Sequence, residues 1–340
     1  MKGKQVVAAG LIAVGALLTG AVQSGFAAEA KPKEVVIGVQ VIPNGEILAK
    51  AKGWYEKELG TKVNFKQFDS GRDVNTALAS NAIDIGLLGT TPAAVGIARG
   101  IPYEVFWIHD VIGEAESLAV KNKSAIKSVK DLVGKKVAVP VGSTAHFSLL
   151  SALKLAGVKP ADVKILDLQP PDILAAWQRG DIDAAYVWQP TLGKLLADDG
   201  TAVTDSRQLA KKGFVTADIG VVRSEFARTY PELVTNYVKI QLKAYKHYKS
   251  DFKDTSATIG KAFNIDKAEA AKEINELVWL SGKEQLSKAY FGSSAKKGAL
   301  PKILKSTADF LVEQKSIDKA PGLDIFEKAV NPSFIEKALK

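Results

Sequence analysis

Cysteine is absent from this sequence of 340 residues, and histidine occurs only three times. Without a thiol the chain can form no disulfide, no thiolate metal site and no cysteine nucleophile. The histidines, at His109, His146 and His247, do not have metal-ligand spacing, and no HExxH pattern occurs. Walker loops, dinucleotide-binding glycine loops and serine-hydrolase elbows are missing as well. We therefore expect a protein that holds no metal and no cofactor and that is not an enzyme.

Charge of either sign is not concentrated anywhere in the chain. Lysine and arginine number 46 against 37 acidic residues, which gives a formal net charge of +9, and no basic run with interleaved aromatic residues occurs. This pattern argues against nucleic acid as a partner. The net positive charge instead favours the attraction of an anionic ligand.

The first residues have the features of a targeting segment. Lys2 and Lys4 precede an uncharged apolar run at Val6–Val22, and small residues follow near Ala28. This order is typical of a secretory signal peptide, which we predict to span residues 1–28. The alternative is a membrane anchor, but a run of about 17 residues is shorter than the roughly 20 that a spanning helix needs. Because no cysteine is available for a lipid anchor, we predict a soluble, monomeric periplasmic protein.

The rest of the chain, about 310 residues, suits two lobes better than one compact core. From Glu34 to Asp110 short apolar strands alternate with helical patterns, which predicts an open parallel sheet in the first lobe. Val137–Trp188 repeats this alternation with three strands and two helices. The fold class is therefore α/β.

Two strands are expected to connect the lobes. Glu114–Lys121 runs out of the first lobe and Phe214–Arg223 returns to it, which makes a two-strand hinge. We therefore assign residues 34–115 and 219–340 to lobe 1 and residues 116–218 to lobe 2.

Small polar loops follow several of the predicted strands. Three of them, Gln40–Asn44, Asp69–Gly71 and Gly89–Thr91, end strands of lobe 1, where ligands bind in open α/β sheets. In lobe 2 the turn Gly142–His146 begins a helix, so its backbone N–H groups and two hydroxyls can hold an anion. The alternative for these hydroxyls is plain helix capping, which uses the same geometry.

Asp218 stands out because it interrupts an otherwise apolar strand. A carboxylate buried there needs a partner, which is either a structural one, such as an arginine, or the ammonium group of a ligand. Glu116, on the other connecting strand, is a second candidate for the same role.

Trp188 ends a strand, where its indole N–H can reach the cleft. Gln169 precedes a helix and either caps it or binds the ligand.

Four segments carry a resemblance to a known family: Phe68–Gly71, Ser143–Leu150, Leu168–Pro171 and Ala175–Trp188. Through them the chain resembles the taurine-binding periplasmic proteins of taurine ABC transporters, within the wider group of aliphatic-sulfonate and nitrate receptors. The resemblance extends over essentially the whole chain after the signal peptide and is closest across Val137–Trp188. It departs from the family at Ala145, where members carry threonine.

The resemblance implies a type II periplasmic-binding-protein fold, in which two α/β lobes joined by a two-strand hinge close on one small molecule. It also implies docking of the closed form onto a membrane permease with its ATPase. The ligand-binding residues that it implies are Gln40, Ser70, Gly89, Thr90, Glu116, Ser143, Thr144, His146, Gln169, Trp188 and Asp218.

Taurine, the ligand implied by the resemblance, carries a sulfonate and an ammonium group on one short chain. We expect the sulfonate at the helix start around Ser143 and Thr144, with a further donor from Gln40 or Thr90, and the ammonium at Asp218. Within the same fold, the alternatives are alkanesulfonates, nitrate or a pyrimidine precursor as ligand. From another class, the alternative is an exported enzyme that resembles porphobilinogen deaminase or an enzyme of pyrimidine synthesis. The lack of cysteine excludes the first, and the predicted signal peptide argues against both.

Overall fold

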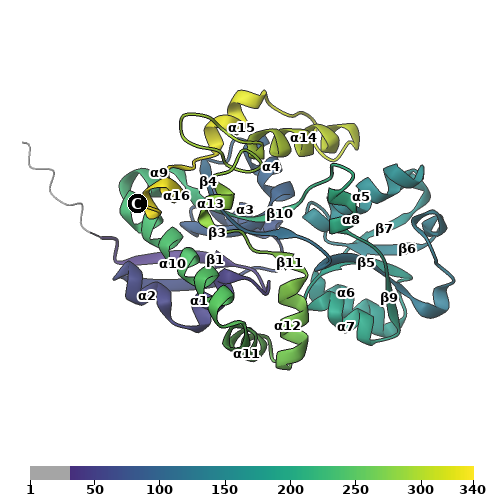
Figure 1. Ribbon diagram of the computed structural model, residues 1–340. Helices are drawn as coiled ribbons and strands as arrows, with labels where there is room; N and C mark the ends of the chain where they lie inside the picture. The colour runs from purple at the N-terminus through teal and green to yellow at the C-terminus, as the bar shows by residue number, and fades with distance from the viewer. Residues whose placement is uncertain (1–30) are drawn as a thin grey trace, which may run out of the picture. The chain divides into compact units, whose positions relative to one another are not determined.

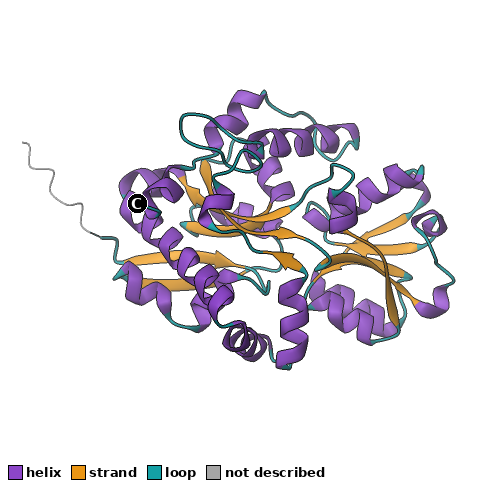
Figure 2. Ribbon diagram, in the orientation of Figure 1, coloured by secondary structure: helices purple, strands orange, loops and turns teal. Residues whose placement is uncertain are grey.

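The computed structural model describes residues 31–340, and the predicted signal peptide lies outside them. The described residues form one compact unit with two β-sheets and helices on their faces (Figure 1, Figure 2). Among the helices of this unit, none combines the length and the apolar character that a bilayer crossing requires.

The first sheet is formed by six strands: β1 (Glu34–Val39), β2 (Lys62–Gln67), β3 (Ile85–Gly89), β4 (Tyr103–Ile112), β10 (Ala217–Arg223) and β11 (Leu277–Val278). Their order is β11-β4-β10-β3-β1-β2. β1 is parallel to β2 and β3, but β10 lies between β3 and β4 and is antiparallel to both. The prediction of an open parallel sheet was therefore wrong at this position. The chain leaves the sheet at the end of β4 and returns at the same end, so the returning strand β10 must run in the opposite direction.

The second sheet is formed by five strands: β5 (Glu116–Lys121), β6 (Lys136–Val139), β7 (Lys164–Asp167), β8 (Ala184–Trp188) and β9 (Gly200–Asp205). Their order is β7-β6-β8-β5-β9. β6 is parallel to β7 and β8, which confirms the three alternating strands predicted in the middle of the chain. β5 is antiparallel to both of its neighbours, β8 and β9.

Helices cover the faces of both sheets. In the first part of the chain these are α1 (Gly45–Ala51), α2 (Trp54–Leu59), α3 (Gly71–Ala79) and α4 (Thr90–Ala98). Around the second sheet they are α5 (Thr144–Ala156), α6 (Pro170–Arg179), α7 (Thr191–Ala197) and α8 (Ser206–Ala210). The last part of the chain forms α9 (Ser224–Thr229), α10 (Pro231–Ser250), α11 (Phe252–Phe263), α12 (Lys267–Asn275), α13 (Gly282–Gln285), α14 (Leu300–Glu313), α15 (Leu323–Ala329) and α16 (Ser333–Ala338). Figure 1 shows α5 and α8 on one face of the second sheet and α6 and α7 on the other.

Two stretches of the sequence with a continuous helical pattern are each divided into two helices. The helical pattern at Glu46–Leu59 is interrupted at Gly53, which adopts a left-handed φ of 63° between α1 and α2. The pattern that begins at Glu225 is divided at Pro231, the first residue of α10. A proline disfavours the helical conformation of the residue before it, and Tyr230 accordingly has a non-helical ψ of 54°.

The chain crosses between the two sheets twice. The segment 113–115 joins β4 to β5, and the segment 206–216, which contains α8, joins β9 to β10. The crossings lie beside each other, because the Ile112 N–H donates to the Thr216 carbonyl at 3.0 Å. Lobe 1 is the part of the protein that contains the six-stranded sheet, and lobe 2 is the part that contains the five-stranded sheet. We expected Asp218 to be the last residue of lobe 2. Because β10 begins at Ala217, Asp218 instead belongs to a strand of lobe 1.

Helix α14 provides a further contact between the lobes. It packs on α4 of lobe 1. Its Phe310 ring lies 5.1 Å from Phe147 of α5 and 5.8 Å from Phe214, between ring centroids. Glu313, at the end of α14, accepts hydrogen bonds from Lys154 of α5 at 2.8 and 2.9 Å. The C-terminal part of the chain therefore holds lobe 2 by both apolar and charged contacts.

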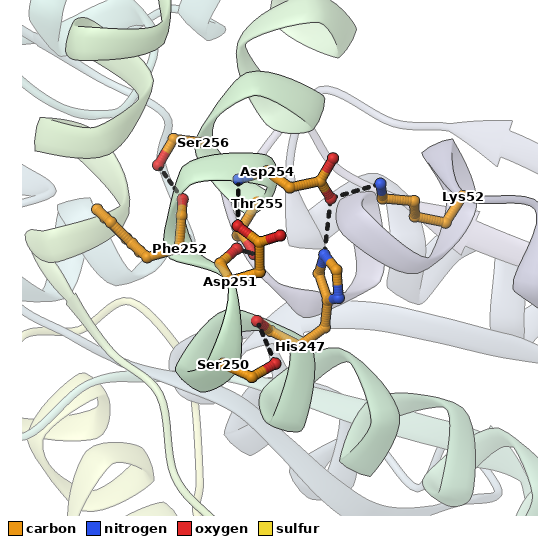
Figure 3. Close-up of polar contacts among 8 residues, drawn as sticks. All are labelled: Lys52, His247, Ser250, Asp251, Phe252, Asp254, Thr255 and Ser256. Carbon is orange, nitrogen blue, oxygen red and sulfur yellow. Dashed lines mark hydrogen bonds and ion pairs between the residues drawn. The ribbon is translucent and has the colours of Figure 1, made fainter.

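The corner between α10 and α11 is fixed by a small ion-pair network, which Figure 3 shows. Asp254 of α11 lies 2.7 Å from His247 Nε2 of α10 and 2.5 Å from the Nζ of Lys52, which follows α1. Asp251 caps α11 by accepting from the Asp254 N–H at 2.9 Å. The hydrogen bond from Lys52, followed by that from His247, holds the pKa of Asp254 below its usual range. The network joins three helices of lobe 1.

Candidate ligand-binding site

A narrow cavity lies between the two lobes. Strand ends and helix starts of both lobes form its walls, which is the usual position of a ligand site in open α/β sheets. The residues that line it are Gln40, Ile42, Pro43, Gly71, Gly89, Pro92, Ile112, Ala115, Glu116, Ser143, Thr144, Trp188, Gln189, Asp218 and Leu277.

Three helix starts meet at this cavity. Gly71 is the first residue of α3, Gly89 is the N-cap of α4, and Ser143 is the N-cap of α5. The first N–H groups of a helix have no partner within the helix and carry partial positive charge. Each of these helices follows a strand that ends between the lobes, and small residues at the turns let the backbone approach closely. This wall of the cavity therefore suits an anionic group.

The two hydroxyls expected to bind the anion are engaged within the protein. Ser143 Oγ donates to the Pro140 carbonyl at 2.6 Å and accepts from the His146 N–H at 3.2 Å. Thr144 Oγ1 donates to Glu116 Oε2 at 2.5 Å. Both hydroxyls therefore orient the start of α5, and the donors that they leave available to an anion are the backbone N–H groups of the first turn.

Glu116 lies at the start of β5 and is 1% exposed. Three hydroxyls surround its carboxyl group, because Ser206 Oγ and Ser148 Oγ donate to Oε1 at 2.9 and 3.3 Å in addition to Thr144. Burial raises the pKa of Glu116 to about 7, although the hydroxyls act in the opposite direction. The charge of this residue therefore responds to pH near neutrality.

Asp218 lies directly opposite Asp110 in the antiparallel pair of β10 and β4. The two side chains are 6% and 0% exposed, and only Asp218 lines the cavity. Their carboxyl groups are near enough to affect each other's ionisation, and Asn44 Nδ2 donates to Asp110 Oδ2 at 3.0 Å. Burial raises the pKa of both, that of Asp110 to about 7. Two adjacent buried carboxyl groups without a cation do not both ionise, so one of them keeps a proton.

Another buried carboxyl group lies behind the cavity. Glu46 of α1 accepts from the Tyr237 hydroxyl at 2.6 Å, and burial raises its pKa to about 8. Among the ion pairs of residues 31–340, none involves Glu46, Asp110, Glu116 or Asp218. The structural alternative for Asp218, an arginine partner, is thus not found in this part of the chain. A cationic group of a ligand would balance the charge of these acids.

The lobes approach each other closely at the cavity. A Cβ atom at Gly89 of lobe 1 would lie 2.5 Å from Thr144 Cγ2 of lobe 2, so only glycine permits this approach. Gln40 Nε2 donates to the Leu87 carbonyl at 3.0 Å, which leaves its second N–H for a ligand. Trp188 stands at the end of β8, opposite Glu116 in the register of β5 and β8.

Most of the residues expected at the site from the sequence line this one cavity: Gln40, Gly89, Glu116, Ser143, Thr144, Trp188 and Asp218. The other four expected residues do not line it. Gln169 Nε2 donates to Ser70 Oγ across the lobes at 3.3 Å, and Thr90 Oγ1 accepts from the Ala217 N–H at 3.3 Å. His146 lines a separate cavity, and its burial lowers its pKa to about 4. Gln169, Ser70 and Thr90 thus make contacts within the protein, and His146 lines the other cavity.

Among the polar residues of the site, Gln189 and Asp110 were missed by the sequence analysis. Gln189 lines the cavity and donates from Nε2 to Glu276 Oε2 at 2.8 Å. Asp110 lies behind Asp218 and contacts it. The signal for both was present, since Asp110 stands near the end of an apolar strand and Gln189 directly follows Trp188 at another strand end.

Comparisons with known proteins agree with this chemistry. The model of the NMT1/THI5-like family matches residues 44–251. The taurine-binding periplasmic protein of Escherichia coli (strain K12) is 37% identical over 293 residues, which are 86% of this chain and 83% of that protein. The putative aliphatic sulfonates-binding protein of Bacillus subtilis (strain 168) is 30% identical over 337 residues, which are 97% of this chain and 96% of that protein.

Solved structures provide the comparison of folds. The alkanesulfonate-binding protein of Xanthomonas axonopodis pv. citri, bound to MOPS, superposes with a TM-score of 0.74 at 23% identity and covers 89% of this chain and 99% of that chain. This likeness concerns the fold alone. It confirms the predicted fold, in which two α/β lobes are arranged as in a type II periplasmic binding protein.

Proposed function

This chain belongs to the NMT1/THI5-like family, and from that premise we propose that it is the solute-binding protein of an ABC importer that carries taurine. Its relatives from Escherichia coli and Bacillus subtilis are named for the binding of taurine and of aliphatic sulfonates, and the chain covers most of the length of each. The choice of taurine within this group rests on the residues of the cavity.

The observation that carries the proposal is that one cavity contains two kinds of group, which are N–H donors for an anion (its first pole) and carboxyl groups for a cation (its second pole). Helix starts at Gly71, Gly89 and Ser143 provide N–H donors and partial positive charge. Asp218 and Glu116 provide buried carboxyl groups without a cationic partner among the described residues. Taurine has a sulfonate for the first pole and an ammonium for the second, whereas nitrate and plain alkanesulfonates leave the acids without a partner.

At the first pole, backbone groups do the binding. The sulfonate oxygens accept from the first N–H groups of α3 and α5 and from the second Nε2 hydrogen of Gln40. The hydroxyls of Ser143 and Thr144 act indirectly, because each already donates within the protein. Neutral donors suffice here, since the sulfonate is ionised at every physiological pH and the helix starts carry partial charge.

At the second pole, Asp218 receives the ammonium from the side of lobe 1 and Glu116 from the side of lobe 2. The ring of Trp188 and the apolar side chains of Ile42 and Leu277 enclose the two-carbon bridge. Because residues of both lobes contact the ligand, taurine favours the closed arrangement by its higher affinity for that state.

The partners and the location follow from this role. We infer that the predicted signal peptide is removed, that the protein acts as a monomer in the periplasm, and that its closed form docks onto a permease with its ATPase. The periplasmic relatives support this assignment. Taurine is bound and released without a chemical step, so the protein is not an enzyme.

Substitution of the acid at the second pole tests the proposal. Asp218→Asn keeps the shape of the side chain and removes its charge, so we expect taurine affinity to fall at least tenfold, because a buried charge pair contributes about 2 kcal/mol or more. Ethanesulfonate, which has no ammonium, should bind the variant about as well as it binds the wild type. Isothermal calorimetry measures both, and Asp309→Asn, an exposed acid on α14, is the matched control.

Equal losses for the two ligands would contradict the role of Asp218. Wild-type protein that binds ethanesulfonate or nitrate more tightly than taurine would instead identify a receptor for simple anions.

A further inference from the structure

We propose that Asp110 is a specificity-determining residue of this site, because it shares one proton with Asp218 in the empty cavity and that proton leaves when the ligand's ammonium arrives. The inference rests on the proposed function and adds a positioning residue and a proton exchange to it. We refer to Asp110 and Asp218 as the acid pair.

The geometry places the two carboxyl groups on adjacent strands, away from water. They are cross-strand neighbours on β4 and β10, and both are buried. Asn44 Nδ2 donates to Oδ2 of Asp110, and Oδ1 has no hydrogen-bond partner among the described residues. Two neighbouring buried carboxylates without a cation would repel each other, so one of the two groups keeps a proton.

The charged and titratable groups around the acid pair do not replace that proton. Glu46 of α1 and Glu116 of β5 face the pair and are acids themselves. His109 of β4 is neutral, because burial lowers its pKa to about 3. Tyr237 of α10 donates to Glu46, and Lys50 of α1 acts on the same glutamate. Within residues 31–340, no ion pair brings a lysine or arginine to the acid pair.

An ammonium changes this balance. It donates up to three hydrogen bonds and carries one positive charge, so it takes over the function of the shared proton. In the empty site the acid pair carries one negative charge and one proton. In the complex both carboxylates are ionised, the ammonium keeps all its hydrogens, and one proton passes to water. Because burial raises the pKa of both groups, the shared proton is still bound at neutral pH and is there to be exchanged.

The exchange makes specificity depend on pH. Taurine affinity should rise as pH increases from about 6 to about 8, because less free energy is then needed to remove the proton. Ethanesulfonate has nothing that replaces the proton, so its affinity should not rise over the same range. The empty cavity is also less negative than two ionised acids would make it, which avoids repulsion of the approaching sulfonate.

Calorimetry in two buffers of different ionisation enthalpy, at about pH 6.5, counts the protons released on binding. We expect the wild type to release most of one proton per taurine and close to none per ethanesulfonate. Asp110→Asn can still accept from Asn44 and donate to Asp218, but it has no proton to exchange. This variant should release clearly less than the wild type, and its taurine affinity should depend less on pH.

Glu116→Gln separates the acid pair from the other titratable group of the cavity. If the acid pair is the source, this variant binds taurine more weakly yet still releases the proton, and Asp309→Asn behaves as the wild type. Loss of the release in Glu116→Gln, or its persistence in Asp110→Asn, would overturn the inference. Should Asp110→Asn fail to fold, infrared difference spectra of the wild type decide the matter, since the carbonyl band of a protonated carboxyl group must disappear when taurine binds.

Failure of the inference can be told from failure of the proposed function. Tight taurine binding without proton release refutes the shared proton and leaves the function intact. Absence of taurine binding, with ethanesulfonate bound, refutes both.

Discussion

At the scale of single residues, the two lobes can meet at the cavity only because a residue without a side chain lies at their contact. Gly89 has no side chain where Thr144 of the other lobe presses against it, and a Cβ atom there would lie 2.5 Å from the threonine methyl carbon. The φ of Gly89 is −72°, so alanine meets no backbone strain at this position and its effect is confined to the contact between lobes.

We expect Gly89→Ala to weaken taurine binding about tenfold or more, because an added carbon at a tight contact costs roughly 1–3 kcal/mol. The clash arises only when the lobes meet, so the stability of the empty protein should change little. Calorimetry and urea unfolding measure the two quantities.

Thr144→Ser tests the cause of that effect. It removes the methyl group and keeps the hydroxyl that donates to Glu116. Combined with Gly89→Ala it should restore most of the lost affinity, while on its own it should have a small effect. A double variant no better than Gly89→Ala would show that the contact with the methyl group is not responsible.

At the scale of elements, α14 belongs in sequence to the end of the chain but in space to both lobes. Phe310 is 7% exposed and packs among the aromatic rings of Phe147 and Phe214. The ion pair of Glu313 with Lys154 lies on the surface beside it, with half-exposed side chains. The two contacts join the same helices, so they allow apolar and charged contributions to be compared.

Phe310→Ala should lower the free energy of unfolding by about 3 kcal/mol, because it removes a buried ring and leaves a space. Glu313→Gln, on the same helix, should lower it by less than about 1 kcal/mol, as is usual for exposed ion pairs. Urea unfolding at moderate salt measures both. Equal effects of the two substitutions would refute the view that the apolar contact holds α14 to lobe 2.

At the scale of the whole molecule, lobe 1 and the hinge contain an unusual number of buried acids with raised pKa values. These values are about 7 for Asp110 and Glu116 and about 8 for Glu46 and Glu273. Burial is the largest cause for each of them. In the folded chain these groups bind protons more tightly than in the unfolded chain, where the ordinary values of 3.8 and 4.5 apply.

The consequence is a loss of stability as pH rises. Between about pH 6.5 and 8.5 the folded state holds protons that the unfolded state has already released, so the free energy of unfolding of the empty protein should fall by roughly 1–2 kcal/mol per pH unit. The buried histidines His109 and His146 act in the opposite direction, but only below the ordinary histidine value of 6.5. Acids with lowered pKa values, such as Asp254, act at still lower pH.

Urea unfolding across this pH range, with and without saturating taurine, measures the effect. Taurine should reduce the fall, because its ammonium balances the ionised acids. Glu46→Gln keeps an oxygen for the Tyr237 hydroxyl and removes one titrating group, so its curve should be flatter. A stability that increases with pH in the empty protein would contradict this account.

Much of the fold follows from local patterns. Each strand from β1 to β8 was expected from a short apolar run, and α5 was expected from the small polar turn before it. Buried strands and helix starts leave such signals because they depend on neighbouring residues along the chain. Asp218 was likewise recognisable, since a carboxylate in an apolar strand needs a partner wherever that strand lies.

Other features depend on contacts between distant segments. The apolar strand around Asp218 indicated that this carboxylate needs a partner, but the insertion of β10 between β3 and β4 placed Asp110 beside it. The same insertion put Asp218 in lobe 1, and the path of α14 put Phe310 against lobe 2. Local patterns report whether a residue is buried and in which kind of element. The neighbours of a strand are instead chosen by the packing of segments far apart in the chain, and no local pattern records that choice.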